Sequence, residues 1–224
     1  MSRKDQYRKM VPEFVRYLNR YVSEYLHESS DALESRAEEI YAGMYAETPE
    51  IGGGDNPMAA NLYEFMTFCA YYEASEHRID EDSVPVISGW MLEDKKILGR
   101  LVNLNHKACV WLMNRLAKFI ADKTEKKKAA GEWGNTWRIQ YNPEGHTEGV
   151  SMVLYGCPLL AFARAHGYEK MMPKFCRIDH QSAALMHAKL IRRETESGGG
   201  SCCNYWFVGD RSETAEKYAD FPQI

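Results

Sequence analysis

The sequence predicts an α+β fold in which a helical N-terminal half packs on a C-terminal antiparallel sheet with inserted helices. Through roughly the first 125 residues, apolar side chains recur at three- and four-residue steps, which is the period of a helix. After Gly131, turn residues, aromatics and short apolar runs prevail, which is typical of strands. With 224 residues and 45% hydrophobic content, the chain can fill a substantial core. We expect a helical layer over residues 1–130 and an α+β part over residues 131–224 that together form one structural unit.

The helical half divides at its turn signals. An apolar stripe over residues 11–25 predicts the first helix, and Ser30 and Asp31 are natural N-caps for a second helix that ends near Tyr45. A loop with three successive glycines follows, at residues 48–57. The further helices are expected over residues 58–76, 83–100 and 104–123, the last of which leads into a solvated basic run at residues 126–128.

The C-terminal part predicts the order ββααββ. Pro158 suits the first turn of a helix and Gly167 suits its end, so we expect a helix over residues 158–166. A glycine-rich turn at residues 197–201 separates the last two strands. The other elements are expected over residues 136–141 and 150–155 (strands), 173–188 (helix), and 190–195 and 204–208 (strands).

Composition excludes several classes of function. The 28 Lys and Arg against 32 Asp and Glu leave a formal charge of −4, which argues against nucleic acid as a partner. The longest uncharged run, residues 149–163, is shorter than the roughly 20 apolar residues of a membrane span. The charged start lacks a secretory signal, so we expect a cytoplasmic protein whose six cysteines are thiols. A small molecule is the expected partner, and self-association stays open.

Four of the six cysteines, Cys157, Cys176, Cys202 and Cys203, fall at the boundaries of predicted elements rather than inside helices. Cys157 directly precedes Pro158, where the free N–H groups and positive end of a helix lower a thiol pKa. The alternative is that each is a small buried hydrophobe. That alternative is the one we adopt for the two cysteines inside helical stripes, Cys69 and Cys109.

Cys176, Asp179 and His180 are spaced three and four residues apart, which places them on one helical face, and His187 extends that face. A thiol, a carboxylate and an imidazole can supply the nucleophile, charge partner and proton carrier for attack on an amidine or acyl carbon. Packing with a helix cap explains the same spacing equally well.

Arg192 and Arg193 precede the glycine turn on a predicted strand, where alternation directs them to opposite faces. One of the two could therefore face the site and hold a substrate carboxylate through paired hydrogen bonds. The competing interpretation, which spacing favours, is an ordinary surface arginine.

The C-terminal third resembles the L-2-amino-thiazoline-4-carboxylic acid hydrolase family. The resemblance lies in three spaced elements: a strand-to-helix cysteine, a Cys-x-x-Asp segment on the following helix, and an arginine, threonine and glycine turn that leads to a final cysteine. The residues that carry it are Tyr155–Gly156–Cys157–Pro158, Phe175–Cys176–Arg177–Ile178–Asp179, and Arg192, Thr195, Gly199, Cys203, Asn204 and Tyr205. Asn204 stands where the family usually has aspartate.

The resemblance implies hydrolytic opening of a small sulfur and nitrogen heterocycle on the route from 2-amino-thiazoline-4-carboxylate to cysteine. In the preferred mechanism Cys176 is the nucleophile, Asp179 protonates or orients the amidine nitrogens, and an arginine holds the carboxylate. His180 or His187 carries the proton. The site residues expected on this basis are Cys176, Asp179, Cys157, Cys203 and His180 for catalysis and Arg192, Arg193, Tyr155 and Asn204 for substrate binding. No metal or other cofactor is expected.

Two alternatives remain. The family is similar to 4-vinyl reductase-type sensor domains, so a non-catalytic domain that binds a small molecule or metal is one. A zinc or iron hydrolase with Cys157, Cys176 and Cys203 as ligands is the other, although no CxxC or HExxH motif is present.

The site hypothesis makes two structural predictions. Cys157, Cys176 and Cys203 should converge on one pocket at one end of the sheet, while Cys69 and Cys109 lie in the helical layer. The helical half should cover the cysteine-bearing end of the sheet, with residues 48–57 as a lid. Ordinary core packing is the favoured interpretation of the helical aromatics, with an apolar wall of the site as the alternative; these aromatics are Trp90, Trp111, Tyr63, Phe68 and Tyr72.

Overall fold

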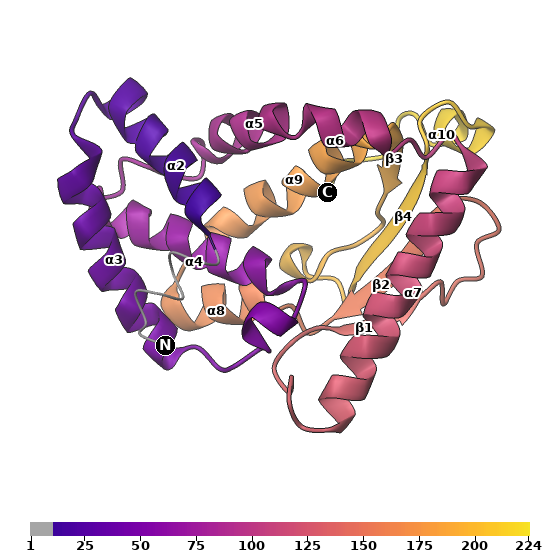
Figure 1. Ribbon diagram of the computed structural model, residues 1–224, viewed down its shortest axis with the longest axis horizontal. Helices are drawn as coiled ribbons and strands as arrows, with labels where there is room; N and C mark the ends of the chain where they lie inside the picture. Colours follow the sequence, from indigo (N-terminus) through magenta and orange to yellow (C-terminus); the bar gives the residue numbers. More distant parts are fainter. Residues whose placement is uncertain (1–10) are drawn as a thin grey trace.

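The computed structural model describes residues 11–224, apart from the side chains of residues 98 and 100. It has the expected α+β architecture: a group of helices lies beside a four-stranded antiparallel sheet, and one long helix flanks the sheet (Figure 1). The strand order is β1-β2-β4-β3, and the elements of the C-terminal part follow one another as ββααββ, as predicted.

The helical layer is built around α4, which is buried on nearly every side. Its buried residues include Phe65, Phe68 and Cys69, so this helix supplies the centre of the larger core. α3 lies along it, and α2 and α8 also contact it. The bounds of the helices before the sheet are α2 Pro12–Tyr21, continued by a π-helical turn Val22–Leu26, α3 Ser30–Glu47, α4 Ala59–Ala74, α5 Val84–Asp94, α6 Lys96–Leu101 and α7 Lys107–Ala129.

Several boundaries in this half differ from the predicted ones. Ser29, not Ser30 or Asp31, is the N-cap residue of α3. The helix expected over residues 83–100 is two helices, separated at Lys95. α7 continues through the basic run because Lys128 Nζ donates to the main-chain oxygens of Gly134 (2.9 Å) and Thr136 (2.6 Å), so this end of the helix is tied to the chain that follows.

The sheet consists of β1 Arg138–Tyr141, β2 Val150–Tyr155, β3 Ala188–Ile191 and β4 Cys203–Gly209. In the register of the central pair, Leu154 lies opposite Cys203 and Val153 lies opposite Asn204. Because side chains alternate along a strand, Cys203 and Leu154 share one face, and Asn204 and Val153 share the other. A single step in the sequence therefore decides which side of the sheet a residue faces.

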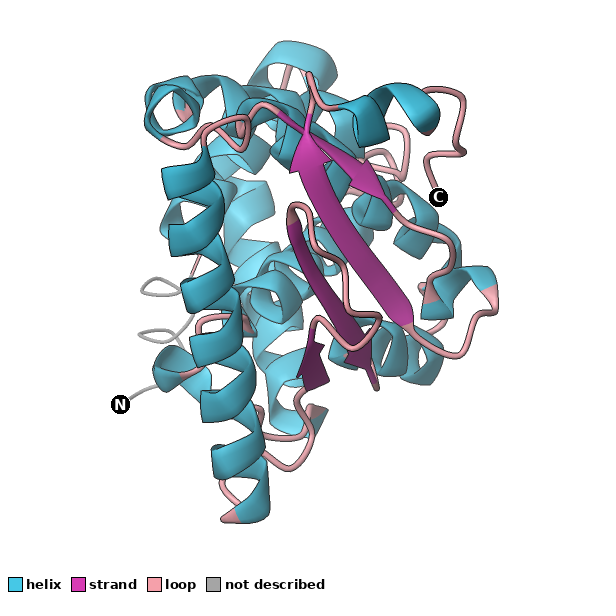
Figure 2. Cartoon of the chain, turned by 90° about the vertical axis from the view of Figure 1, so that its right-hand side faces the viewer, coloured by secondary structure: helices cyan, strands magenta, loops and turns pink. Residues whose placement is uncertain are grey.

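Helices α7 and α9 pack on the face that carries Cys203. One cluster there joins Ala117 of α7 and Ala183 of α9 to Val150 and Leu190 of the sheet. The opposite face packs near β3 and β4 against the short helix α10 (Glu213–Lys217) and Phe221. Figure 2 shows the strands from the side where α7 runs along the sheet. Candidate site residues are thus divided between a face under long helices and a more open one.

The strand predicted over residues 190–195 occurs earlier, as β3, and ends at Ile191. Beyond it, the main-chain N–H groups of Arg193 (2.9 Å) and Glu194 (3.0 Å) donate to the Asn204 side chain. The Asn204 side chain thus accepts the hydrogen bonds that a neighbouring strand would otherwise accept, and the pairing of β3 with β4 ends here. Arg192 and Arg193 therefore lie directly after a strand rather than on one.

Between the two pairs of strands lie α8 Pro158–His166 and α9 Met172–Leu185. α8 begins at Pro158 and ends at Gly167, whose φ of 77° is left-handed, as predicted. α9 stops before His187, which has a φ of 50° and whose Nδ1 lies 3.8 Å from Asp210 Oδ2. The prediction that His187 extends the face of Cys176 is therefore wrong, because the helix ends first.

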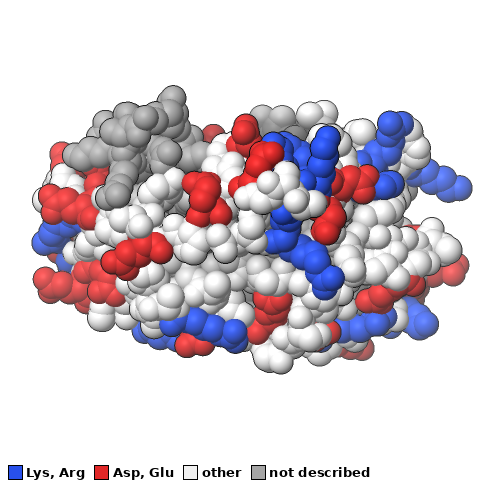
Figure 3. All heavy atoms as spheres, turned by 90° about the horizontal axis from the view of Figure 1, so that it is seen from below, with Lys and Arg blue, Asp and Glu red and all other residues white. Residues whose placement is uncertain are grey.

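Acidic and basic side chains are interspersed on the surface that Figure 3 shows, and this face carries no extended patch of one sign. Over residues 11–224, no helix is both long enough and apolar enough to pass through a lipid bilayer.

Candidate functional site

The turn at residues 195–198 contacts all three cysteines that the sequence singles out. The Ser197 hydroxyl lies 3.2 Å from Cys176 Sγ, and Glu196 N–H donates to Cys203 Sγ at 3.3 Å. The Glu196 carboxylate accepts the main-chain N–H of Cys157 at 2.8 Å. Three elements and one turn therefore meet here, and each of the three cysteines contacts this turn. That the three share one pocket stays a prediction.

Cys157 stands at the start of α8 and is its N-cap residue. The preceding Gly156 has a left-handed φ of 69°, a conformation that glycine adopts without strain. This bend turns the N–H groups of Gly156 and Cys157 to the same side, where they donate to the two oxygens of Glu196 at 2.6 and 2.8 Å. A carboxylate is thus bound directly beside the Cys157 thiol.

Burial is the largest influence on all three thiols. It raises the pKa of Cys157 to about 11 and that of Cys203 to about 12, and it also raises the pKa of Cys176. Helix N–H groups oppose the shift at Cys157, while the Ser197 hydroxyl and the charge of Arg192 oppose it at Cys176. The expected lowering of the Cys157 pKa by the helix is therefore outweighed by burial, and all three are thiols at neutral pH.

Behind Cys176 lies an ion pair between Arg192 and Asp179, whose Nη1 and Oδ2 are 2.7 Å apart. Among the described residues, Arg192 is the largest fully buried side chain, with no exposed surface, and it also donates to the main-chain oxygens of Cys176 and Ile224. The Tyr205 hydroxyl donates to the same Asp179 oxygen at 3.1 Å. Burial raises the pKa of Asp179, and Arg192 opposes this.

Among the predicted site residues, the burial of Arg192 differs most from what the sequence led us to expect. An exposed strand arginine was the favoured alternative, yet its guanidinium is enclosed and bound to Asp179 and to two main-chain oxygens. The cost of this burial is offset because all three guanidinium nitrogens donate hydrogen bonds. A substrate-binding role for Arg192 stays a prediction, and it would require Ile224 to move away.

His180 follows Asp179 on α9, and its Nε2 lies 3.2 Å from the main-chain oxygen of Ile224, which requires that nitrogen to carry the proton. Burial lowers the pKa of His180, so the neutral imidazole prevails at pH 7. The hydrogen bonds of the described residues do not link His180 to a thiol. Its role as proton carrier stays a prediction.

Three predicted substrate-binding residues lie on the other side of the sheet. Tyr155 donates to Gln140 at 3.1 Å and stacks under Arg138, and Asn204 accepts the two N–H groups that end β3. The guanidinium of Arg193 is half-exposed and pairs with Glu144. The structure therefore separates these three residues from the cysteines.

Of the neighbouring pair, Cys203 faces the site and Cys202 faces away, where its thiol donates to Glu194 at 3.3 Å. Cys69 is buried within α4, and Cys109 lies on α7. Both therefore lie in helices outside the cluster, as predicted.

A cavity of about 480 Å³ opens beside the start of α8. Cys157 and Glu196 lie in its wall, whereas Cys176 and Cys203 do not appear among its lining residues. Apolar side chains form much of the rest: Ile51, Leu62, Leu160 and Phe162. Cys157 is therefore the thiol of the cluster that a molecule in this cavity would meet.

Residues 48–57 reach this cavity, because Thr48, Pro49 and Ile51 line it. Their position fits the predicted lid, whose movement stays a prediction. The aromatic wall considered from the sequence is not the wall observed. Tyr63, Phe68 and Tyr72 are buried in the core, Trp90 packs against it and Trp111 is exposed on α7.

Sequence reasoning missed Glu196, Ser197 and Tyr205 as parts of the site. The Thr195 side chain accepts the N–H of Gly198 at 3.0 Å, and this hydrogen bond closes a turn. The side chains of the two residues between them, Glu196 and Ser197, project from the turn. That Thr-x-x-Gly pattern was a readable signal for the turn. Nothing local, however, indicated that these side chains would reach cysteines from 20 to 40 residues away.

Over the described part of the chain, no group of three or more His, Cys, Asp and Glu side chains is placed to hold a metal ion.

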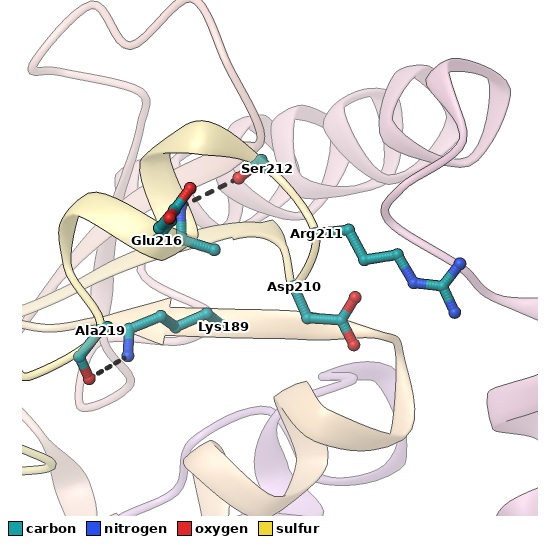
Figure 4. Close-up of a pocket in the computed structure, with 7 residues that line it drawn as sticks. Lys189, Asp210, Arg211, Ser212, Glu216 and Ala219 are labelled. Carbon is teal, nitrogen blue, oxygen red and sulfur yellow. Dashed lines mark hydrogen bonds between the residues drawn. The ribbon is translucent and has the colours of Figure 1, made fainter.

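A second hollow, of about 500 Å³, lies between β3 and α10 (Figure 4). Lys189 there donates to the Ala219 main-chain oxygen at 3.0 Å, and the Asp210 and Arg211 side chains extend outward. None of its lining residues belongs to the cysteine cluster.

Fold and site together define an α+β protein with a cysteine cluster beside a cavity. The family model for L-2-amino-thiazoline-4-carboxylic acid hydrolase matches residues 60–207, which include the three cysteines, the turn and the Arg192–Asp179 pair. The chain belongs to this family, and the family name indicates a hydrolase. No curated protein and no solved structure matches the chain.

Proposed function

We propose that this protein hydrolyses a small ring containing sulfur and nitrogen, of the 2-amino-thiazoline-4-carboxylate type, at the cavity beside Cys157. One observation carries the proposal: a thiol and a carboxylate, Cys157 and Glu196, stand together in the wall of a cavity of about 480 Å³. A cavity of this size accepts a small heterocycle with room for water.

The reacting carbon of such a ring lies between sulfur and nitrogen and is amidine-like. Addition of the Cys157 sulfur forms a new C–S bond while the thiol proton passes to the ring nitrogen, so no free thiolate is required at pH 7. Collapse of the adduct breaks one ring bond, and water then releases the thiol of Cys157. The net change is addition of one water molecule to the ring.

The resemblance favours Cys176 as the nucleophile, whereas the cavity favours Cys157. Cys176 lies behind the turn, with its thiol at Ser197 and its main-chain oxygen at Arg192. In the proposed site Cys176, Asp179 and Arg192 hold the turn and the thiol cluster in position. Cys176 as the attacking thiol remains the alternative.

A non-catalytic binding domain and a thiolate-bound metal hydrolase are the competing functions. The experiment is to purify the full chain without a metal-affinity tag, to measure its zinc and iron, and to follow ring opening by the new thiol and by mass. Ring opening by metal-free protein supports the proposal. Ligand binding without turnover would support a sensor, and turnover that a chelator abolishes would support the metal hydrolase.

A further inference from the structure

The cavity beside Cys157 carries opposite charges at its two ends. Glu196 lies at the end where Gly156 and Cys157 begin α8. Arg164 lines the same cavity from the last turn of α8. Glu47 adds a second carboxylate from α3, and His166 adds an imidazole beside Arg164.

The helix sets the spacing of the two ends. Cys157 and Arg164 are seven residues apart, which is close to two turns, so they lie on one face of α8 with about 10 Å of rise between them. In the structure Arg164 Nε lies 3.4 Å from Glu169, beyond the C-terminal end of α8, so a ligand near Cys157 requires this side chain to turn back along the helix. A long guanidinium side chain leaves room for one small ring between itself and the thiol.

Both charged groups are free enough to take a ligand. The Arg164 side chain is 61% exposed, and its contact with Glu169 is long, at 3.4 Å. A carboxylate has about four acceptor positions, and the two N–H groups at Glu196 occupy two of them. Arg192, by comparison, has no exposed surface.

We propose that this cavity selects small zwitterions and orients them, with the ligand carboxylate at Arg164 and its amidine nitrogens at Glu196. This inference rests on the proposed function and names the substrate class and orientation at the same site. The amidine carbon is then held at Cys157, and Arg164 and Glu196 act as specificity-determining residues. An uncharged ring would gain neither contact.

Two ligands test the orientation: 2-amino-thiazoline-4-carboxylate and 2-amino-thiazoline, which lacks the carboxylate. Binding of each is measured by calorimetry in a Cys157→Ser background, so that turnover does not interfere. We expect Arg164→Gln to weaken the carboxylate ligand about tenfold and to leave the other ligand within twofold. Glu196→Gln should weaken both ligands by a similar factor, because both carry the amidine.

Two variants serve as controls. Arg164→Lys keeps the charge and should restore most of the affinity for the carboxylate ligand. Arg138→Gln removes an exposed arginine that stacks on Tyr155, on the opposite face of the sheet, and should change neither affinity. Equal weakening of both ligands by Arg164→Gln, no weakening, or no binding of either ligand would overturn the proposal.

Turnover separates this inference from the proposed function. With Cys157 intact, Arg164→Gln should raise KM for the carboxylate substrate and leave kcat nearly unchanged, the pattern of lost uniform binding. Ring opening that proceeds with an unchanged KM would reject the orientation and keep the hydrolase. Ligand discrimination without any ring opening would keep the orientation and reject the hydrolase.

Discussion

Two charged sites adjoin the same thiol cluster, and they differ in access. On one side, Glu196 and Cys157 line a cavity. On the other, Asp179 and Arg192 form an ion pair whose arginine has no exposed surface. Both contain residues suited to catalysis, yet only Cys157 and Glu196 are among the residues that line this cavity.

The difference teaches that residue type and spacing identify a site more readily than they identify its reacting face. Asp179 and Arg192 bind each other. In addition, Asp179 accepts a hydrogen bond from Tyr205, and Arg192 donates one to the main-chain oxygen of Ile224. Such a network positions the cluster and is costly to disrupt. The cavity side holds fewer interactions within the protein, which is what a binding surface requires.

The largest expected effect separates the two sides by activity. Cys157→Ser should lower kcat/KM about a thousandfold or more, because a serine hydroxyl is a far weaker nucleophile at that position. Cys176→Ser should cost about tenfold or less, since it perturbs the contact with Ser197 only. Steady-state kinetics on both variants, with thermal unfolding as a check on folding, measures this.

Cys109→Ser serves as the matched control for a cysteine outside the cluster and should leave kinetics unchanged. The reverse ranking, with Cys176→Ser inactive and Cys157→Ser active, would place the nucleophile on the buried side and reject the assignment made from the cavity.

The free energy of unfolding should depend on Arg192, which is in the ion pair, far more than on the adjacent Arg193. Arg192→Met leaves Asp179 without its buried partner, and we expect a loss of about 2–3 kcal/mol in the free energy of unfolding, the partial exposure of Asp179 having been allowed for. Arg193→Met removes a half-exposed arginine and should change it by less than about 0.5 kcal/mol. Denaturant titration of both variants gives the values; equal losses would show that Arg192 is not the anchor.

Titration of the Cys157 thiol provides a further test of how buried it is. The folded state raises the pKa of Cys157 from 9.0 to about 11, so between these values the folded chain holds a proton that the unfolded chain has released. Stability should therefore fall as the pH rises from about 9 to about 11. The alkylation rate of the Cys157 peptide should rise about tenfold per pH unit below pH 10, because the thiolate is the reactive form.

Mass spectrometry after timed alkylation follows this peptide directly, and urea-unfolded protein is the reference. A rate that is already maximal at pH 8 would show a thiolate in the resting protein and would contradict the burial argument.

The smallest effect concerns Asn204, on the open face. Asn204→Ala removes the acceptor for the N–H groups of Arg193 and Glu194 and should cost about 1 kcal/mol of stability with kinetics within twofold. Asn204→Asp introduces the aspartate that the resemblance leads us to expect at this position and should keep both stability and kinetics near those of the unsubstituted protein. A large change in substrate preference in the Asn204→Asp variant would indicate that residue 204 contacts the substrate, which would contradict this expectation.

Much of the local structure was readable from the sequence alone. The start of α8 at Pro158, its end at Gly167 and the limits of β2 agree with the expected ones, because proline and glycine set backbone dihedrals whatever surrounds them. The convergence of Cys157, Cys176 and Cys203 was also predicted, from their positions at element boundaries and from the resemblance.

Only the tertiary structure decided which of these residues face a ligand. Arg192 is the largest of the fully buried side chains that the structure describes, because Asp179 and two main-chain oxygens, distant in sequence, supply its acceptors. The register of β2 and β4 put Asn204 and Tyr155 behind the sheet, and Glu196 reached Cys157 across 39 residues of chain. Local sterics fix an element's limits, whereas burial and partnership depend on contacts that form only when those elements pack together.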